Sequence, residues 1–502
     1  MCGLLFSKGK IDRKLFEDSL SLMRHRGPDF SSTLFIDDIS MGHNRLSIID
    51  LNPRSHQPFR YKNYIIIFNG EIYNYKELIT DHKLMPKTTS DTEVILLMYE
   101  KYGYKCLDYF NGMFAFVIYN SERKEIFAAR DRLGIKPLYM RTCCENTFFS
   151  SEIAPLLKIK SSDLDDFAFR QYRKLRMTIK GYTFYKDIKM FPPGHYYLNG
   201  KLSRYWELDT TSKQSPSDEE LEWLIMDSVK LRKRSDVPLG SYLSGGLDST
   251  ILSALLKPTH TWTVGFESLN EFMWSELANS KLDTKHHKIV VDKYEYLKTT
   301  ENMIRRRMEP LSVPNEVLIY IMTKEVKKYN TVILSGEGAD ELFWGYDRIF
   351  KWAYKAKELN INEFDAKYCY GTNNDVEILA FALEDLPGKN VIDKIAYYFQ
   401  IIHLQGLLRR LDNSTMLCSV EARVPFVDHR LVELLAGTSY EYRMGKSIKE
   451  PLKRIYRNLI PEEIINREKV GFPVPLNEIF SSKNNTTPMD NWLLFNINTI
   501  TN

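Results

Sequence analysis

The sequence has few cysteines, no long apolar run and almost no excess of either charge. Its 502 residues include six cysteines, and none forms a C-x-x-C pair, so neither a zinc site nor a disulfide framework is indicated. No apolar run approaches the roughly 18 residues of a membrane span, which predicts a soluble protein. With 69 Lys and Arg against 65 Asp and Glu, the formal charge of +4 argues against a nucleic-acid partner.

We also expect no secretory leader. Polar residues from Ser7 to Lys10 interrupt the apolar stretch behind Cys2 far too early for a signal peptide. We therefore expect a cytoplasmic protein with small-molecule substrates and no membrane partner. A homodimer remains possible.

The chain is too long for one hydrophobic core, and its 43% hydrophobic and 27% charged residues are ordinary globular usage. Between Glu207 and Glu220 the sequence is polar and contains Pro216, which predicts a linker, with a helix starting near Ser217. The predicted domains are residues 1–207 and 208–502.

The start Met1-Cys2-Gly3 carries a potential nucleophile. Removing Met1 would place a thiol and a free α-amine on the same residue. An α-amine titrates at about pH 8, so a useful fraction of it is neutral at cellular pH. This neutral amine could accept the thiol proton without a separate histidine. The dipeptide alone is weak evidence, since short motifs often match by chance.

Four further segments, in order, resemble class II glutamine amidotransferases, the N-terminal-nucleophile hydrolases. They are Arg24 to Asp29, His43 to Ile48, Phe68 to Asn74 and Ser90 to Glu93. The resemblance implies an α/β fold, an αββα sandwich, with Cys2 as the nucleophile.

The same resemblance assigns roles for binding glutamine. Arg45 would clamp the glutamine carboxylate as a planar fork, within a motif that continues through Leu46, Ser47 and Ile48. Glu71 and Asp91 would take its ammonium. The Asn69 side-chain amide and the Gly70 backbone N–H would form the oxyanion hole.

The second half alternates strands and helices. The pattern predicts strands at 238–243, 261–266, 288–291 and 331–334 and a helix at 248–256, and therefore a parallel sheet covered by helices on both faces. At its first strand-to-helix turn lies Ser244-Gly245-Gly246-Leu247-Asp248-Ser249, where small residues let backbone N–H groups converge on phosphate oxygens. The turn is not a Walker loop, because the required spacing and lysine are missing.

This turn resembles the pyrophosphate loop of ATP pyrophosphatases, the adenine nucleotide α hydrolase-like enzymes that adenylate an acceptor and release pyrophosphate. The segment Leu334 to Phe343 follows a strand, so its carboxylates should lie at the sheet edge where ligands bind in such folds. Asp248 and Asp340 are therefore candidate ligands of Mg²⁺.

Together the two halves resemble glutamine-hydrolysing asparagine synthetase over nearly the whole chain. The resemblance implies that asparagine is made from aspartate, glutamine and ATP, with glutamate, AMP and pyrophosphate as co-products, and that ammonia passes between the sites inside the protein. Leu243, Val264, Ser335 and Gly336 would hold adenosine, while Ser244, Gly245, Gly246, Asp248 and Ser249 would hold the phosphates. Glu337 would lie beside the adenylated acceptor, and Lys449 would reach the phosphate charges unless it is a surface lysine.

Two departures from the family pattern leave the acceptor open. The segment Met308 to Asn315 differs from the usual one, and Trp344 stands where a glycine is common and could reshape the pocket. The same machinery could therefore act on another carboxylate, such as a sugar acid or a secondary-metabolite precursor. A cyclising enzyme resembling β-lactam synthetase is disfavoured, because that branch lacks a working glutaminase. Here the glutaminase residues Cys2, Asn69, Gly70 and Asp91 are all present. A storage or scaffold protein would have no reason to keep two complete sites.

Overall fold

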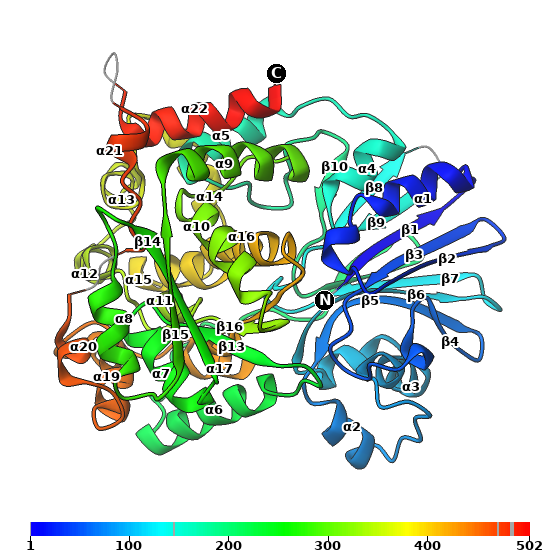
Figure 1. Ribbon diagram of the computed structural model, residues 1–502, viewed down its shortest axis with the longest axis horizontal. Coiled ribbons are helices and arrows are strands. Elements are labelled where there is room, and N and C mark those ends of the chain that lie inside the picture. The colour runs from blue at the N-terminus through cyan, green and yellow to red at the C-terminus, as the bar shows by residue number, and fades with distance from the viewer. Residues whose placement is uncertain (1, 144–145, 469–470, 482–485, 502) are drawn as a thin grey trace.

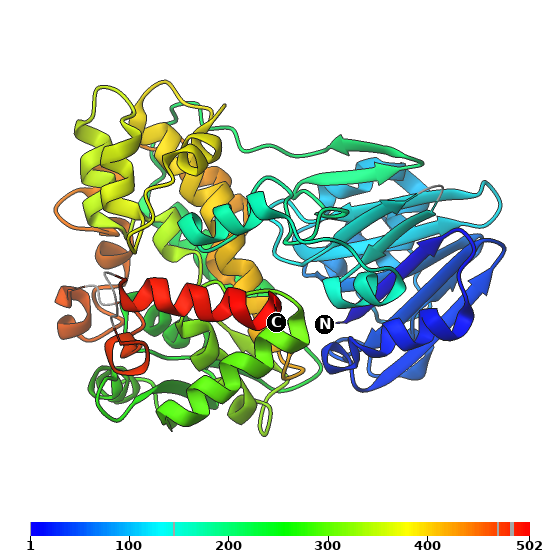
Figure 2. The same ribbon diagram turned by 90° about the horizontal axis from the view of Figure 1, so that it is seen from above.

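The computed structural model describes residues 2–143, 146–468, 471–481 and 486–501. The structure has two halves that lie side by side (Figures 1 and 2). The boundary at residue 207 stays a prediction from the sequence, and the first and second halves below mean the residues before and after it. The first half contains two antiparallel sheets, and the second contains one parallel sheet surrounded by helices. The predicted fold class is confirmed.

The first half is a sandwich of two six-stranded sheets. One sheet has the order β10-β8-β9-β1-β3-β2, with β1 at Gly3–Lys8, β2 at Phe30–Ile36, β3 at Ile39–Arg45, β8 at Tyr139–Cys143, β9 at Asn146–Ser150 and β10 at Ile188–Met190. The other has the order β12-β11-β7-β6-β5-β4, with β4 at Phe59–Tyr61, β5 at Tyr64–Ile72, β6 at Gly112–Asn120, β7 at Glu125–Arg130, β11 at His195–Leu198 and β12 at Lys201–Arg204.

Alternating side chains build the core between these sheets. Leu4 and Phe6 of β1 face Ile65 and Ile67 of β5, whereas Leu5 points to the other side. This is the two-residue period of a strand. Helices cover the outer faces, with α1 and α4 on one sheet and α2 and α3 on the other (Figure 1). The helices of this half are α1 at Arg13–Ser21, α2 at Tyr75–Asp81, α3 at Asp91–Tyr102, α4 at Ile153–Ile159 and α5 at Asp166–Leu175.

The second half is organised around a five-stranded sheet in which every pair is parallel. Its order is β15-β14-β13-β16-β17, with β13 at Leu239–Tyr242, β14 at His260–Phe266, β15 at Lys285–Val291, β16 at Val332–Leu334 and β17 at Glu421–Arg423. The first four strands match the prediction from sequence. The short strand β17 was not predicted, because three residues carry too little periodicity.

Helices surround this sheet. They are α6 at Asp218–Arg232, α7 at Leu247–Leu256, α8 at Phe272–Asn279, α9 at Lys293–Arg307, α10 at Asn315–Val326, α11 at Ala339–Leu342, α12 at Asp347–Lys355, α13 at Ile361–Tyr368, α14 at Val376–Leu383, α15 at Val391–Tyr397, α16 at Leu404–Met416, α17 at His429–Leu435, α18 at Tyr440–Met444, α19 at Glu450–Tyr456, α20 at Glu462–Asn466, α21 at Leu476–Ile479 and α22 at Pro488–Thr501. Ser217 caps α6 by accepting a hydrogen bond from Glu220 N at 3.1 Å, as expected for a helix starting there. Across the described residues, no helix has the length and apolar character needed to cross a bilayer.

A separate apolar cluster lies among α12 to α15 and draws in residues from the first half. Leu175, Met177 and Ile179, at and after the end of α5, pack into it. The first half therefore contributes to the packing of the second.

Trp344 is also part of this cluster. It is 3% exposed and stacks on Phe350 with ring centroids 4.9 Å apart, while the Arg443 guanidinium lies 4.5 Å from its ring. Its φ of 55° lies in the left-handed region, where a β-carbon is strained. Packing thus holds this residue in an unfavourable backbone conformation.

Trp344→Gly should destabilise the protein despite relieving that strain. Emptying a buried tryptophan site costs about 3–5 kcal/mol, whereas the left-handed conformation costs a non-glycine residue only about 1–2 kcal/mol. Urea denaturation should show a lower free energy of unfolding for Trp344→Gly and a smaller loss for Trp344→Phe, which keeps a stacked ring. An unchanged midpoint for the glycine variant would contradict this packing role.

Candidate active sites

Cys2, at the start of β1, is buried beside Asn69 of β5. The Cys2 backbone N–H donates to Asn69 Oδ1 at 3.0 Å, so the Asn69 side chain is held against the nucleophile's own backbone. Asn69 Nδ2 is buried and has no hydrogen-bond partner among the residues that the structure describes. An unsatisfied buried donor is what a developing oxyanion requires. Met1 lies outside the described residues.

Gly70 follows Asn69 on the same strand. A β-carbon at this position would lie 2.1 Å from the carbonyl oxygen of Met113 on β6. Only glycine therefore fits at this position, and the part of its backbone N–H in the oxyanion hole stays a prediction.

Arg45, at the end of β3, is held by the loop that follows it. Nη1 lies 3.2 Å from the Asn52 carbonyl and 3.0 Å from His56 Nδ1, while Nη2 donates to the carbonyls of Ile49 and Asp50. A substrate carboxylate would have to share or replace some of these contacts. Of the neighbouring predicted residues, Leu46 and Ile48 are buried, and Ser47 N donates to Asp29 Oδ2 at 2.7 Å.

Glu71 and Asp91, the predicted ammonium partners, are both buried. Burial and the nearby Glu421 raise the pKa of Asp91 to about 6, although the Ile72 N–H, which donates to Asp91 Oδ2 at 2.9 Å, opposes the shift. Burial, Glu421 and Asp91 also raise the pKa of Glu71.

Two residues of the second half, Glu421 and Arg423, complete this charged group. Arg423 Nη2 lies 3.6 Å from Glu71 Oε1, and Arg423 Nε lies 2.5 Å from Glu421 Oε1. No role for these two residues is predicted from the sequence. The available signal was a pair of opposite charges two residues apart in an otherwise apolar stretch.

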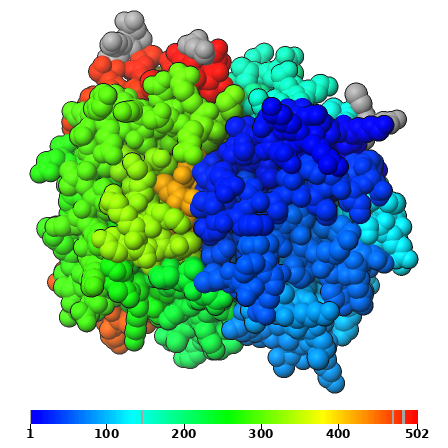
Figure 3. All heavy atoms as spheres, turned by 45° about the vertical axis from the view of Figure 1, so that its right-hand side comes forward, coloured from blue at the N-terminus to red at the C-terminus, as the bar shows by residue number. Residues whose placement is uncertain are grey.

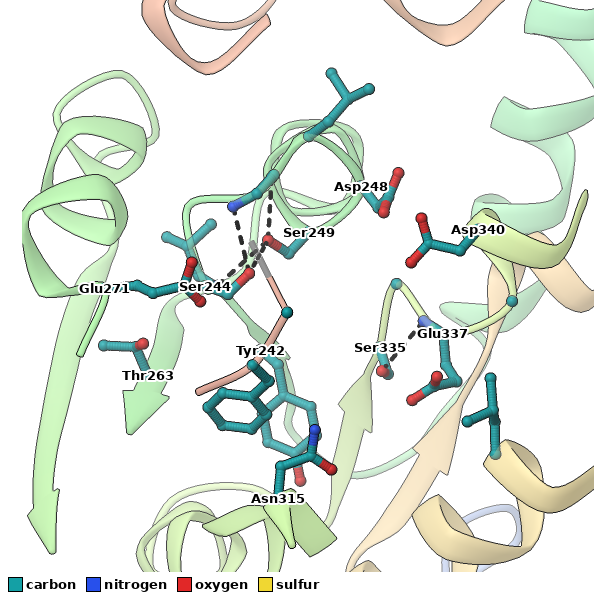
Figure 4. Close-up of a pocket in the computed structure, with 18 of the residues that line it drawn as sticks. Tyr242, Ser244, Asp248, Ser249, Thr263, Glu271, Asn315, Ser335, Glu337 and Asp340 are labelled. Atoms are coloured by element: carbon teal, nitrogen blue, oxygen red, sulfur yellow. Dashed lines mark hydrogen bonds between the residues drawn. The ribbon is translucent and has the colours of Figure 1, made fainter. Parts of the chain in front are cut away.

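The predicted nucleotide site is a cavity of about 390 Å³ at the carboxyl ends of β13, β14 and β16 (Figure 4). This volume is within the usual range of ligand pockets. The predicted residues that line it are Leu243, Ser244, Gly246, Asp248, Ser249, Val264, Ser335, Gly336, Glu337, Asp340 and Lys449. Gly245 supports the turn from behind: its φ is +75°, and a β-carbon would lie 2.3 Å from the backbone of Trp274 on α8.

Lys449 is buried between the two candidate metal ligands, not at the surface. Its Nζ lies 2.5 Å from Asp248 Oδ2 and 2.6 Å from Asp340 Oδ1, and Figure 4 shows the two carboxylates facing each other. Burial by itself lowers the pKa of Lys449, but the two carboxylates outweigh it and raise the pKa. One cation is thus already shared by a pair of hard oxygen ligands, a donor set that suits Mg²⁺.

Among the described residues, no three His, Cys, Asp or Glu side chains gather as a metal cage. This is compatible with Mg²⁺ bound together with a nucleotide, because such an ion uses one or two carboxylates and the substrate's phosphates.

Glu337 is held by residues that the sequence did not identify. Its Oε2 accepts a hydrogen bond from Arg410 Nη2 of α16 at 2.7 Å, and Arg410 Nη1 donates to Asn315 Oδ1 at 3.1 Å. Both Arg410 and Asn315 line the cavity. The sequence singles out Asn315 only as the last residue of the segment that departs from the family pattern, and nothing in it marks Arg410.

Trp344 does not line this cavity. Its side chain packs against Phe350 in the neighbouring apolar cluster. The expectation that it could reshape the pocket is therefore wrong.

Comparisons with known proteins cover both halves. A family model described as a glutamine amidotransferase domain matches residues 1–206, and one described as asparagine synthase matches residues 220–493. The chain is 29% identical to glutamine-hydrolyzing asparagine synthetase 1 of Bacillus subtilis (strain 168), over 97% of this chain and 89% of the relative. It is 30% identical to glutamine-hydrolyzing asparagine synthetase 2 of Oryza sativa subsp. japonica, over 94% and 75%. It is 29% identical to glutamine-hydrolyzing asparagine synthetase B of Escherichia coli (strain K12), over 90% and 77%.

Lys449→Ala should make thermal stability depend on Mg²⁺. Without the Lys449 ammonium group, the carboxylates of Asp248 and Asp340 repel each other, and a divalent cation can occupy the position of the ammonium. Adding about 10 mM Mg²⁺ should raise the melting temperature of this variant by at least about 2 °C more than that of the wild type. The double variant Asp340→Ala/Lys449→Ala is the control. Each protein is measured both in Mg²⁺ and in sodium chloride of the same ionic strength. Equal responses of all three proteins would argue against a cation site here.

Proposed function

The chain belongs to the asparagine synthase family, and we propose that it makes L-asparagine from L-aspartate, with L-glutamine as nitrogen donor and ATP as the energy source. The observation that carries this proposal is the pairing of two sites in one chain. One holds Cys2 against Asn69, and the other places a pyrophosphate-type loop beside Lys449 and Glu337. The cavity of the second site has the volume of a small-molecule pocket. A homodimer and a cytoplasmic location remain predictions from the sequence.

In the first reaction, the Cys2 thiolate attacks the carboxamide carbon of glutamine. The α-amine freed by removal of Met1 would take the thiol proton. Asn69 Nδ2, which has no other partner within the described part of the chain, and the Gly70 N–H would stabilise the oxyanion. The α-ammonium then passes this proton to the leaving nitrogen, ammonia departs, and water hydrolyses the resulting thioester to glutamate. Arg45 would hold the α-carboxylate, and Glu71 and Asp91 the ammonium.

In the second reaction, the side-chain carboxylate of aspartate attacks the α-phosphorus of ATP and displaces pyrophosphate. Backbone N–H groups of the Ser244 to Ser249 turn would hold the phosphates, and Lys449 would neutralise charge that develops on phosphorus. Asp248 and Asp340 would hold Mg²⁺, which when bound supplies further neutralisation of the phosphate charge. Ammonia then attacks the acyl adenylate, AMP leaves, and Glu337 accepts a proton from the attacking nitrogen.

Aspartate is the acceptor that the site supports best. Of the two departures that left the acceptor open, Trp344 packs outside the cavity, whereas the segment Met308 to Asn315 reaches the cavity through Asn315. Arg410, beside Glu337 at the cavity wall, offers a guanidinium to a second carboxylate. The packing of Trp344 and the guanidinium of Arg410 favour a small acceptor that carries two carboxylates.

Cys2→Ala should abolish glutamine hydrolysis and leave ammonia-dependent asparagine synthesis within about twofold of wild type, because the two sites use different residues. Cys369→Ala, a partly buried cysteine outside both sites, is the matched control and should keep both activities. Glutamine hydrolysis by Cys2→Ala at the wild-type rate would rule out this nucleophile, as would retention of Met1 in the intact mass.

The nucleotide products should be AMP and pyrophosphate, one of each per asparagine. Labelled ATP resolved by chromatography would distinguish these from ADP and phosphate, whose formation would contradict the synthetase reaction.

Aspartate should turn over whereas succinate should not, because a site that pairs the α-amino group loses several kcal/mol with an analogue that lacks it.

Glutamine hydrolysis should weaken in acid. Since the pKa of Asp91 is raised to about 6, this carboxyl group is protonated below that pH and no longer balances the substrate ammonium. Protonation of the α-amine, which titrates at about pH 8, already lowers kcat/KM about tenfold per pH unit, so well below pH 6 the fall should steepen to about a hundredfold per unit. Asp91→Asn should have a low kcat/KM and keep only the shallower limb that belongs to the α-amine. A wild-type profile that stays at about tenfold per unit down to about pH 5 would remove Asp91 from glutamine binding.

A further inference from the structure

We propose that Asp412, a residue of the second half, positions the nucleophile Cys2 of the first half through Arg26, and that helix α16 thereby ties the two sites together. This inference rests on the proposed function, in which Cys2 hydrolyses glutamine. Neither Arg26 nor Asp412 touches glutamine in this scheme, so both are positioning residues.

Arg26 is fully buried and makes three contacts that diverge. Its Nε donates to the Cys2 carbonyl oxygen at 3.1 Å, Nη1 donates to Glu152 at 3.2 Å, and Nη2 donates to Asp412 at 2.8 Å. The rigid, planar guanidinium can satisfy all three at once only in one orientation. The position of the Cys2 carbonyl is therefore linked to that of Asp412, on the other side of the interface.

Asp412 is a strong anchor because two cations of the first half share it. Lys136 Nζ lies 3.0 Å from its second oxygen, and the side chains of Asp412, Arg26 and Lys136 are all at most 2% exposed. Burial by itself raises the pKa of Asp412, but the two cations outweigh it and lower the pKa. The carboxylate is thus charged, paired and shielded from solvent.

The turn that carries Arg26 has a second attachment to the same half. Ser419 Oγ, just beyond α16, donates to the carbonyl oxygen of His25 at 2.5 Å. Figure 3 shows the orange part of the second half meeting the blue N-terminal residues at this seam. Residues around the end of α16 therefore hold the backbone of the Arg26 turn as well as its side chain.

Helix α16 reaches the other active site with its opposite face. Successive helical residues are turned by about 100°, so Arg410 and Asp412 point about 200° apart. Arg410 holds Glu337 at 2.7 Å, while Asp412 holds Arg26. Figure 1 shows α16 between the sheet of the second half and the first half. One rigid helix thus carries a contact to each site.

This arrangement predicts an effect on the rate of hydrolysis and not on glutamine binding. The Cys2 backbone is fixed at both ends, by Asn69 at its N–H and by Arg26 at its carbonyl. Without the Asp412 charge, Arg26 can rotate toward Glu152 and release the carbonyl. A small displacement of a nucleophile slows attack strongly, whereas Arg45 and Asp91, which would bind glutamine, are unaffected.

The test compares Asp412→Asn with Asp365→Asn. Asp365 also faces a buried lysine of the first half across the interface, Lys174 at 2.7 Å, but contacts neither site. Asp412→Asn should lower kcat for glutamine hydrolysis about tenfold or more, with KM for glutamine and ammonia-dependent synthesis within about twofold of wild type. Asp365→Asn should retain all three values.

Equal glutamine kcat in the two variants would overturn the inference, as would an equal loss of both activities in Asp412→Asn. If Asp412→Asn does not fold, Arg26→Lys serves instead, because a lysine can pair with Asp412 but cannot also hold Glu152 and the Cys2 carbonyl. It should show the same selective fall in kcat, and a wild-type kcat would overturn the inference. A wild-type protein that hydrolyses no glutamine would instead refute the proposed function itself.

Discussion

A buried charge must be paired, and the interface between the two halves is built around this requirement. Arg26 and Lys136 from one half meet Asp412 from the other, and Glu71 meets Arg423. Removing one partner from such a pair leaves a charge in a medium that solvates it poorly, at a cost of about 3–5 kcal/mol. The two halves are therefore held in one relative position, since a shift of one half along the other would break several ion pairs at once.

The same requirement governs the two sites before any substrate arrives. Lys449 neutralises Asp248 and Asp340, Arg410 neutralises Glu337, and loop carbonyls occupy Arg45. Binding of a charged substrate therefore exchanges one set of partners for another. The free energy lost with the old contacts offsets part of the free energy gained with the substrate. Charge complementarity at these sites therefore contributes more to the choice of substrate than to binding affinity.

Local features of both sites were predictable from the sequence. The Ser244 to Ser249 turn and the Ser335 to Asp340 segment each follow a strand, and parallel strands bring such turns to one edge of a sheet. The partners that hold these residues were not predictable. Arg26 and Asp412 are 386 positions apart, and no periodicity relates them. The loop contacts of Arg45 and the outward course of Trp344 also depend on backbone geometry that residue types do not specify.

The wide separation of Arg26 and Asp412 also has a consequence during translation. At about 5–20 residues per second, a ribosome adds Asp412 roughly 20–80 s after Arg26. Until then the emerging first half lacks the carboxylate that orients its arginine, and it lacks Arg423 beside Glu71. The nascent amidotransferase half is thus kept incomplete until most of its synthetase partner has been made. Unfinished chains would then release little ammonia from cellular glutamine.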